Sequence, residues 1–153
     1  MEFRNEKQVA DAAVRKLESA LRSKTSGFAS HYRGDPADKS MKDATAFAKV
    51  KKYGKGRGNI KRYMTSLSIR MTKYGFIQHF GIDNIRQSGT RFRSKPKETT
   101  YNFAAHYFKM KAQPFINSAI DQSGVIPFVM ENITKLRSEE LIYEIKNVIE
   151  RHR

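Results

Sequence analysis

The middle of the chain constrains the fold most, because it is strongly and almost uniformly basic. Between Asp43 and Glu98, a single acid, Asp83, stands among fourteen Lys and Arg residues. Residues 31–100 carry 17 basic and 5 acidic groups, which is +12 of the formal net charge of +15. This stretch must therefore project a strong positive field somewhere on the surface, and a polyanion is its natural partner.

The rest of the composition fits a single domain over residues 1–153. Ten Phe and seven Tyr supply large apolar side chains for a core. The absence of Cys excludes a disulfide framework, a thiolate zinc site, an iron–sulfur cluster and a cysteine nucleophile. No window approaches the apolar length of a membrane span and no export signal is readable, so we expect no membrane partner.

Both ends of the chain have the apolar spacing of amphipathic helices. From about residue 3 to residue 23, the apolar stripe predicts a helix with one face for the core; it contains Val9, Ala13, Leu17, Ala20 and Leu21. At the other end, Ser138 predicts the N-cap of a terminal helix. Its stripe contains Leu141, Ile142, Ile145, Val148 and Ile149. A stripe this wide is usually intramolecular core, and we favour that interpretation over a face for a partner helix.

Two further helices are predicted before the terminal one. Pro114 suits the first turn of a short helix that Gly124 closes. Pro127 opens another helix, which runs through Leu136.

The basic middle contains the signals for strands and loops. Alternate glycines at 54, 56 and 58 predict a hairpin tip, and alternation through Leu67, Ile69 and Met71 predicts a half-buried strand. Residues 73–80 fit either a strand after a bulge or a short helix. The polar stretch around Gly89 and Pro96 predicts a long loop, and residues 100–110 predict a strand that returns to the sheet.

Together these elements predict an α+β fold. We expect a small antiparallel sheet with long hairpin loops, packed against an N-terminal helix and C-terminal helices. We expect basic, flexible loops near residues 25–45, 51–62 and 84–98.

Catalytic and metal chemistry lack a pattern in this sequence. The four histidines have no close ligand spacing, and we interpret His79 and His106 as structural. Asp35, Asp38 and Asp43 lie in a stretch rich in Gly, Pro and Ser, where turn and capping roles are favoured over metal binding. The GKGRG segment at 54–58 lacks the frame of a phosphate-binding loop. We therefore expect no catalytic residue, no metal and no cofactor.

Two groups of basic residues are the candidate interaction site, for a polyanion or for a partner protein. They are Lys49, Lys51, Lys52, Lys55, Arg57, Lys61 and Arg62 in the first group, and Arg86, Arg91, Arg93, Lys95 and Lys97 in the second. Neither group has a basic helix suited to a major groove, so we expect contact with phosphates rather than reading of bases.

The order of several short motifs resembles the tail-completion, or head-tail joining neck, proteins of tailed bacteriophages. In that family an aromatic segment ending in His-x-Gly is followed, after a variable loop, by a Pro-Phe turn that opens a C-terminal helix. The matching residues here are Tyr74, Gly75, Phe76, His79 and Gly81, then Pro114, Phe115, Ile116 and Ala119. The family's Pro-Val-x-Thr-Gly-x-Leu stretch is not intact; Thr25, Ser26, Gly27 and Phe28 stand in its place.

The resemblance implies a structural virion protein without catalytic activity. Such a protein forms a ring with itself at the neck, between the portal or connector and the tail tube, and is in the host cytoplasm during assembly. A basic hairpin repeated around a ring multiplies weak phosphate contacts by effective concentration. The basic loops then face packaged double-stranded DNA or neighbouring ring proteins, and the sequence leaves both open.

The alternative is a small basic protein that binds nucleic acid without sequence specificity, as a monomer or dimer. That function explains the charge but not the apolar organisation of the chain. A nuclease ranks last, because the basic middle lacks the carboxylate cluster that two metal ions require.

Overall fold

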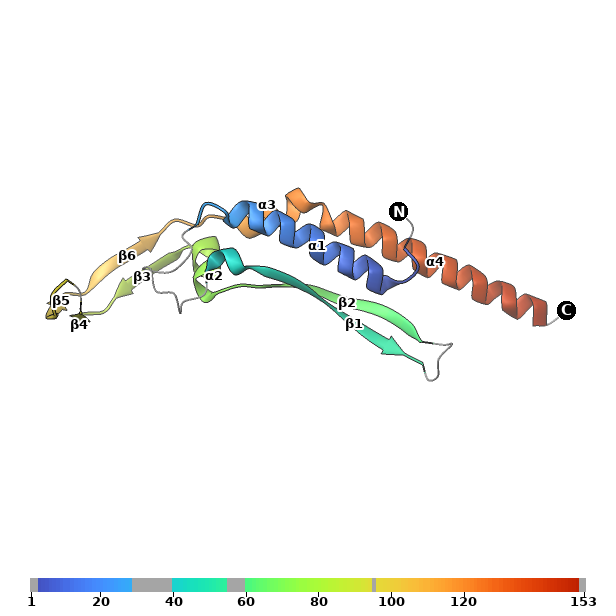
Figure 1. Ribbon diagram of the computed structural model, residues 1–153, viewed down its shortest axis with the longest axis horizontal. Helices are drawn as coiled ribbons and strands as arrows, with labels where there is room; N and C mark the ends of the chain where they lie inside the picture. The colour runs from blue at the N-terminus through green and yellow to red at the C-terminus, as the bar shows by residue number, and fades with distance from the viewer. Residues whose placement is uncertain (1–2, 29–39, 55–59, 95, 152–153) are drawn as a thin grey trace. The chain divides into compact units, whose positions relative to one another are not determined.

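The computed structural model describes residues 3–28, 40–54, 60–94 and 96–151, and the chain divides into two compact units (Figure 1). Unit 1 is residues 1–72 with 115–153, and unit 2 is residues 73–114. The prediction of a single domain stays a prediction. The described elements of unit 1 are α1 (Glu6–Thr25), the short 3-10 helix η2 (Met41–Asp43), β1 (Thr45–Tyr53), β2 (Lys61–Arg70), α3 (Phe115–Ser123) and α4 (Val125–Arg151).

Helix α1 is the central element of unit 1 and contacts every other element in it. It begins where the side chain of Asn5 accepts a hydrogen bond from the backbone N–H of Gln8 at 3.1 Å, which satisfies one of the free helix donors. The five apolar residues of the predicted stripe are all buried. The N-terminal helix is therefore confirmed, with both bounds shifted by two or three residues.

Strands β1 and β2 pair antiparallel and confirm the predicted hairpin. Ala46 pairs with Ile69 and Ala48 with Leu67, and Ala46 belongs to the core cluster against which Leu67 and Ile69 pack. The pairing shifts between Lys49 and Val50, because Thr65 is an extra residue on β2 that forms a bulge. Most of the glycine-rich tip, residues 55–59, lies outside the described residues.

Helices α3 and α4 follow the hairpin region of unit 1 in space and are joined at Gly124, whose φ of +57° suits glycine. The short helix predicted after Pro114 is confirmed. The prediction of two separate helices after it is wrong, because α4 is continuous from Val125 to Arg151. Pro127 lies in its first turn, where a missing N–H is harmless, and Ser138 is accommodated in its interior at small cost.

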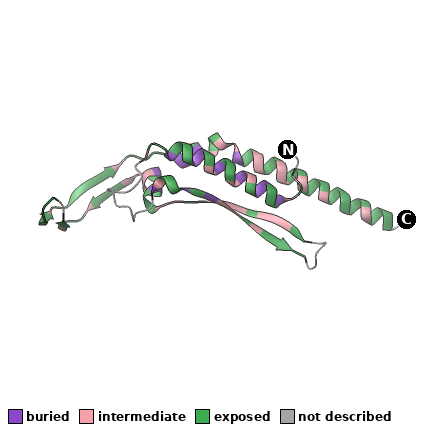
Figure 2. Cartoon of the chain, in the orientation of Figure 1, coloured by how far each residue is buried: buried purple, intermediate pink, exposed green. Residues whose placement is uncertain are grey.

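The stripe near the C-terminus of α4 is not part of the core. We call its five residues, Leu141, Ile142, Ile145, Val148 and Ile149, the distal stripe; their side chains are 51–66% exposed (Figure 2). The prediction that they form intramolecular core is therefore wrong. Helix α4 has 27 residues against 20 in α1, so its last turns run on past the end of α1, where nothing in unit 1 covers them (Figure 1).

Unit 2 consists of one helix and two short ladders. Helix α2 (Lys73–Phe80) ends at Gly81, whose φ is +77° and whose N–H donates to the carbonyl of Ile77 at 2.7 Å. The ladders pair β3 (Ile82–Arg86) with β6 (His106–Met110), and β4 (Gly89–Arg93) with β5 (Thr99–Phe103), both antiparallel. The sequence left residues 73–80 open between strand and helix, and the structure shows a helix.

The three predicted flexible loops coincide largely with regular structure. The loop predicted over 84–98 is wrong, since β3 and β4 occupy much of it. Thr25 lies in α1 and residues 51–53 lie in β1, whereas residues 29–39 are outside the described part of the chain. The strand predicted over 100–110 exists as β5 and β6, separated at Ala104 and Ala105. Polar composition indicated exposure here, and exposed residues can still pair as strands.

The fold is α+β, as predicted from the sequence: helices lie at both ends of the chain and all pairing is antiparallel. The described strands form three two-stranded ladders, of which β1–β2 packs against the helices of unit 1.

Candidate polyanion and partner interface

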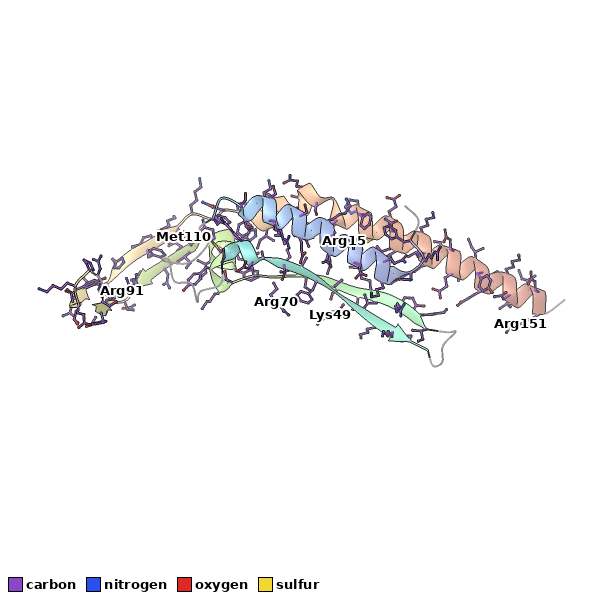
Figure 3. All side chains as sticks on the ribbon, in the orientation of Figure 1. Arg15, Lys49, Arg70, Arg91, Met110 and Arg151 are labelled. Carbon is purple, nitrogen blue, oxygen red and sulfur yellow. The ribbon has the colours of Figure 1, made fainter. Side chains whose placement is uncertain are left out.

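The first group of candidate basic residues lies on the β1–β2 hairpin. Lys49, Lys51 and Lys52 are exposed on β1, and Figure 3 labels Lys49 on this hairpin. Lys61 and Arg62 begin β2. Lys55 and Arg57 lie outside the described residues. Within the described part of the chain, no carboxylate forms an ion pair with the three lysines of β1.

Lys52 and Arg62 are cross-strand partners in the hairpin. Like charges directly opposite each other in a ladder are destabilising, so folding alone does not favour this pair. The buried Nε of Arg62 also has no hydrogen-bond partner among the described residues. An external anion between the two side chains would supply the missing interactions. This pair is therefore the part of the hairpin best suited to a phosphate or a carboxylate.

Lys61 is engaged within the chain instead. Its ammonium forms a short ion pair with Glu140 and a second one with Oε1 of Glu144 at 2.6 Å. Hydrogen bonding to Glu140, and then to Glu144, raises the pKa of Lys61 above its usual range. The group stays protonated, but two carboxylates of α4 neutralise its charge. Lys61 thus joins β2 to α4 rather than facing an external anion.

A buried carboxylate that sequence reasoning missed connects three elements of unit 1. Glu6 is 4% exposed, and its Oε2 accepts a hydrogen bond from the N–H of Met64 at 2.6 Å. Its Oε1 accepts from Nε of Arg137 at 2.7 Å, and this bond raises the pKa of Arg137. The sequence signal was only an acid in the first turn of a helix, which by itself indicates a dipole effect.

A polar pocket of about 410 Å³ opens beside these residues. Cationic and anionic side chains line it together; the lining residues are Arg4, Asn5, Glu6, Ile60, Lys61, Arg62, Tyr63, Leu136, Arg137 and Glu140. Because Glu6 and Glu140 already neutralise Arg137 and Lys61, the positive charge left over comes mainly from Arg4 and Arg62. The pocket therefore extends the candidate anion site at Arg62.

The second group of basic residues lies on the ladders of unit 2. Arg86 ends β3, Arg91 and Arg93 lie on β4, and Lys97 lies between β4 and β5; Figure 3 labels Arg91. Lys95 lies outside the described residues. The guanidinium carbons of Arg86 and Arg91 stand 5.2 and 5.5 Å from the ring centroid of Phe103. This cation–π contact orders both side chains without neutralising them.

Large apolar side chains accompany these arginines. Phe92, Ile85 and Tyr107 are all more than half exposed on the strands of unit 2. Aromatic residues with Arg are enriched at protein interfaces, and they also stack on unpaired bases. Unit 2 therefore offers a surface on which charge and apolar area occur together.

The structure provides no metal site or membrane helix in the residues that it describes. No three His, Asp or Glu side chains among them gather as a metal-binding group. None of the described helices is long and apolar enough to cross a membrane. His79 is buried beside the ring of Phe80, whereas His106 is exposed with Nδ1 at 3.1 Å from the carbonyl of Ala104.

Comparison with known proteins gave no match: no family model, no curated protein and no solved structure is similar to this chain.

Proposed function

We propose that the chain is a non-catalytic structural protein of a tailed phage, a ring-forming component of the neck between portal and tail. The observation that carries the proposal is the large apolar area left exposed on both units. The distal stripe of α4 is uncovered within unit 1, and Phe92, Ile85 and Tyr107 are uncovered within unit 2. Contiguous exposed apolar surface marks a site of protein association, as a subunit of an assembly requires.

The residues of the family resemblance support the same proposal. Gly75 and His79 are buried in α2, and Phe115, Ile116 and Ala119 are buried in α3. These motif positions therefore pack the fold and do not form a reactive cleft. Residues conserved in type for packing are consistent with a protein whose activity is assembly.

The basic residues have a place in this proposal. In a ring, the Lys52–Arg62 pair recurs once in each subunit, so weak contacts with phosphates or acidic partner surfaces add up. Lys49 and Lys51 extend the same charged strand. The ring itself forms on the portal or connector, which presents the symmetry that orders the subunits.

The test removes the coding sequence from the phage that carries it and examines the particles by electron microscopy. We expect filled heads and separate tails, with joining restored by the wild-type chain supplied in trans. A variant with Phe92→Ser and Tyr107→Ser tests the exposed apolar surface, and Arg15→Ala on the exposed face of α1 is the control. Joined, infectious particles in the absence of the chain would contradict the proposal.

The second candidate function is binding of nucleic acid without sequence specificity. The like-charged Lys52–Arg62 pair with its unpartnered Nε favours it. A protein that neutralises several phosphates binds more weakly as salt rises, with a slope proportional to the number of contacts.

This candidate is tested by measuring duplex DNA binding against salt concentration. The variant Lys52→Ser/Arg62→Ser removes the pair, and Arg15→Ala/Lys24→Ala removes the same charge from the exposed face of α1 as a matched control. Tight binding with a steep salt slope that is lost only in the first variant supports DNA as the partner. Equal weakening in both variants indicates an effect of net charge alone.

A further inference from the structure

Unit 1 carries an apolar groove in addition to the exposed distal stripe. The groove has a volume of about 250 Å³ and lies between β2 and the beginning of α4. Its lining residues are Met64, Thr65, Ser66 and Leu67 of β2 with Val125, Ile126, Val129, Met130 and Ile133 of α4. Ile126 and Met130 are at least 60% exposed, so this apolar surface is also uncovered within unit 1.

The groove and the distal stripe are related by their spacing along α4. In the groove, Ile126, Met130 and Ile133 recur at intervals of four and then three. In the distal stripe, Ile142, Ile145 and Ile149 recur at three and then four, which is the same series in reverse. A helix whose apolar spacing reads the same in both directions is complementary to an antiparallel copy of itself.

We propose that two copies of this chain pair through α4, antiparallel, about a two-fold axis between Arg137 and Ser138. In this register Ile126 lies opposite the partner's Ile149, Met130 opposite the partner's Ile145, and Ile133 opposite the partner's Ile142. The distal stripe of each copy fills the groove of the other, so one isologous contact covers both apolar surfaces twice. The two stripes lie on neighbouring faces of α4, so the helices cross at an angle, as packed helices do.

Charge favours the same arrangement. Residues 138–151 carry Glu139, Glu140, Glu144 and Glu150 against Lys146 and Arg151. The antiparallel pair brings this acidic segment alongside β2 of the other copy, in the hairpin that carries Lys49, Lys51, Lys52 and Arg62. Opposite net charges therefore face each other at both ends of the contact, which steers and orients association.

The pairing concerns the chain free of neck components, and it does not depend on the proposed function. Self-complementary spacing is what selects a second copy over an unrelated protein as the occupant. A helix of another protein, or no occupant at all, is an outcome of the test.

The first experiment measures the mass of the full chain by sedimentation equilibrium. We expect a dimer whose dissociation constant rises at least about 100-fold in Ile145→Glu, because a charge is placed in an apolar contact. Tyr143→Glu is the matched control, since Tyr143 is equally exposed on α4 but lies away from the stripe. Both side chains are exposed in a single copy, so circular dichroism should show the fold retained. A wild-type monomer, or equal weakening by both variants, would overturn the proposal.

The second experiment fixes the register, and it is clean because the chain has no natural cysteine. Met130→Cys and Ile145→Cys are made separately, oxidised alone and then oxidised as a mixture. In the antiparallel register only the mixture cross-links, because residue 130 of one copy meets residue 145 of the other. The two identical positions are separated by about 22 Å along the helix, at about 1.5 Å per residue. Efficient cross-linking of Ile145→Cys alone would indicate parallel helices and would overturn the proposal.

Discussion

The two hairpin regions of the chain are built alike but supported differently. Both are antiparallel, and both carry arginine or lysine next to aromatic residues. In unit 1, β1–β2 packs against α1, and Ala46 reaches the buried cluster. In unit 2, all residues of β3, β4, β5 and β6 are described and none of them is buried. Backbone pairing is therefore common to both regions, whereas apolar burial belongs to one.

This difference teaches where the stability of each region comes from. A two-stranded ribbon in water is marginal by itself and gains stability from a face packed on other elements. The hairpin of unit 1 has that support within its own unit. The ladders of unit 2 rely on α2, on cross-strand pairs such as Thr90 with Asn102, and on whatever covers their exposed aromatic residues in an assembly.

The largest expected effect comes from truncating the core behind the supported hairpin. Leu21→Ala removes a fully buried side chain of α1, and we expect the free energy of unfolding to fall by about 2–5 kcal/mol. Phe92→Ala, on the exposed face of unit 2, should change it by less than about 0.5 kcal/mol. Urea unfolding followed by circular dichroism measures both. Similar losses in the two variants would show that the ladders of unit 2 are buried in the protein as studied.

A smaller but sharper effect is expected at the tightest point of unit 2. At Gly81 an added Cβ would lie 2.6 Å from the carbonyl oxygen of Met110 and 2.8 Å from the backbone N of Ala112, with φ at +77°. Gly81→Ala should therefore destabilise unit 2 by about 1–3 kcal/mol. Gly27→Ala is the control, because nothing lies within 4 Å of its added Cβ.

Hydrogen exchange reads the result of this substitution unit by unit. If the units open separately, amides of β3 and β6 lose protection while those of β1 and β2 keep theirs. If all four strands lose protection together, the chain unfolds as the single domain that its length and composition predict.

The sequence predicted the elements whose own periodicity reports burial. The four-residue recurrence from Val9 to Leu21 located α1, and the alternation through Leu67 and Ile69 located β2, because each pattern faces the core of unit 1. The distal stripe has an equally regular pattern and was assigned to the core wrongly. Periodicity shows that a helix has an apolar face, but it does not show which molecule covers that face.

The candidate site was predictable in its composition but not in its internal contacts. The basic character of the two hairpin regions follows from the sequence alone. The neutralisation of Lys61 does not, because Glu144 is 83 positions away and only the packing of α4 on β2 brings the two together. The burial of Glu6 beside Arg137 has the same origin, across 131 positions. Long-range ion pairs leave no local signal in a single sequence.

The buried Glu6 gives a third prediction, on how firmly β2 is joined to the helices. Glu6→Gln keeps the side-chain volume but removes the charge that binds Arg137, so we expect a loss of about 1–2 kcal/mol. Half exposure of Arg137 keeps the loss below that of a fully buried pair. Asp11→Asn, which breaks an exposed pair with Lys7 at 3.3 Å, is the control and should cost less than about 0.5 kcal/mol. Equal unfolding midpoints for the two variants would contradict the structural role of Glu6.

The smallest expected effect tests the polar support of the exposed ladders. The hydroxyl of Tyr107 on β6 donates a short hydrogen bond to Asp83 on β3, and this bond raises the pKa of Tyr107 above its usual value of 10.0. Because the folded chain holds this proton more tightly than the unfolded chain, the contribution is fully present below pH 10. It is lost as the pH rises through the raised pKa. Spectroscopic titration of the tyrosines should show one group ionising late in the wild type, and Asp83→Asn should return it toward the others because the neighbouring negative charge is gone. A late tyrosine that persists in Asp83→Asn would show that burial by another part of an assembly, and not pairing between β3 and β6, protects this face of unit 2.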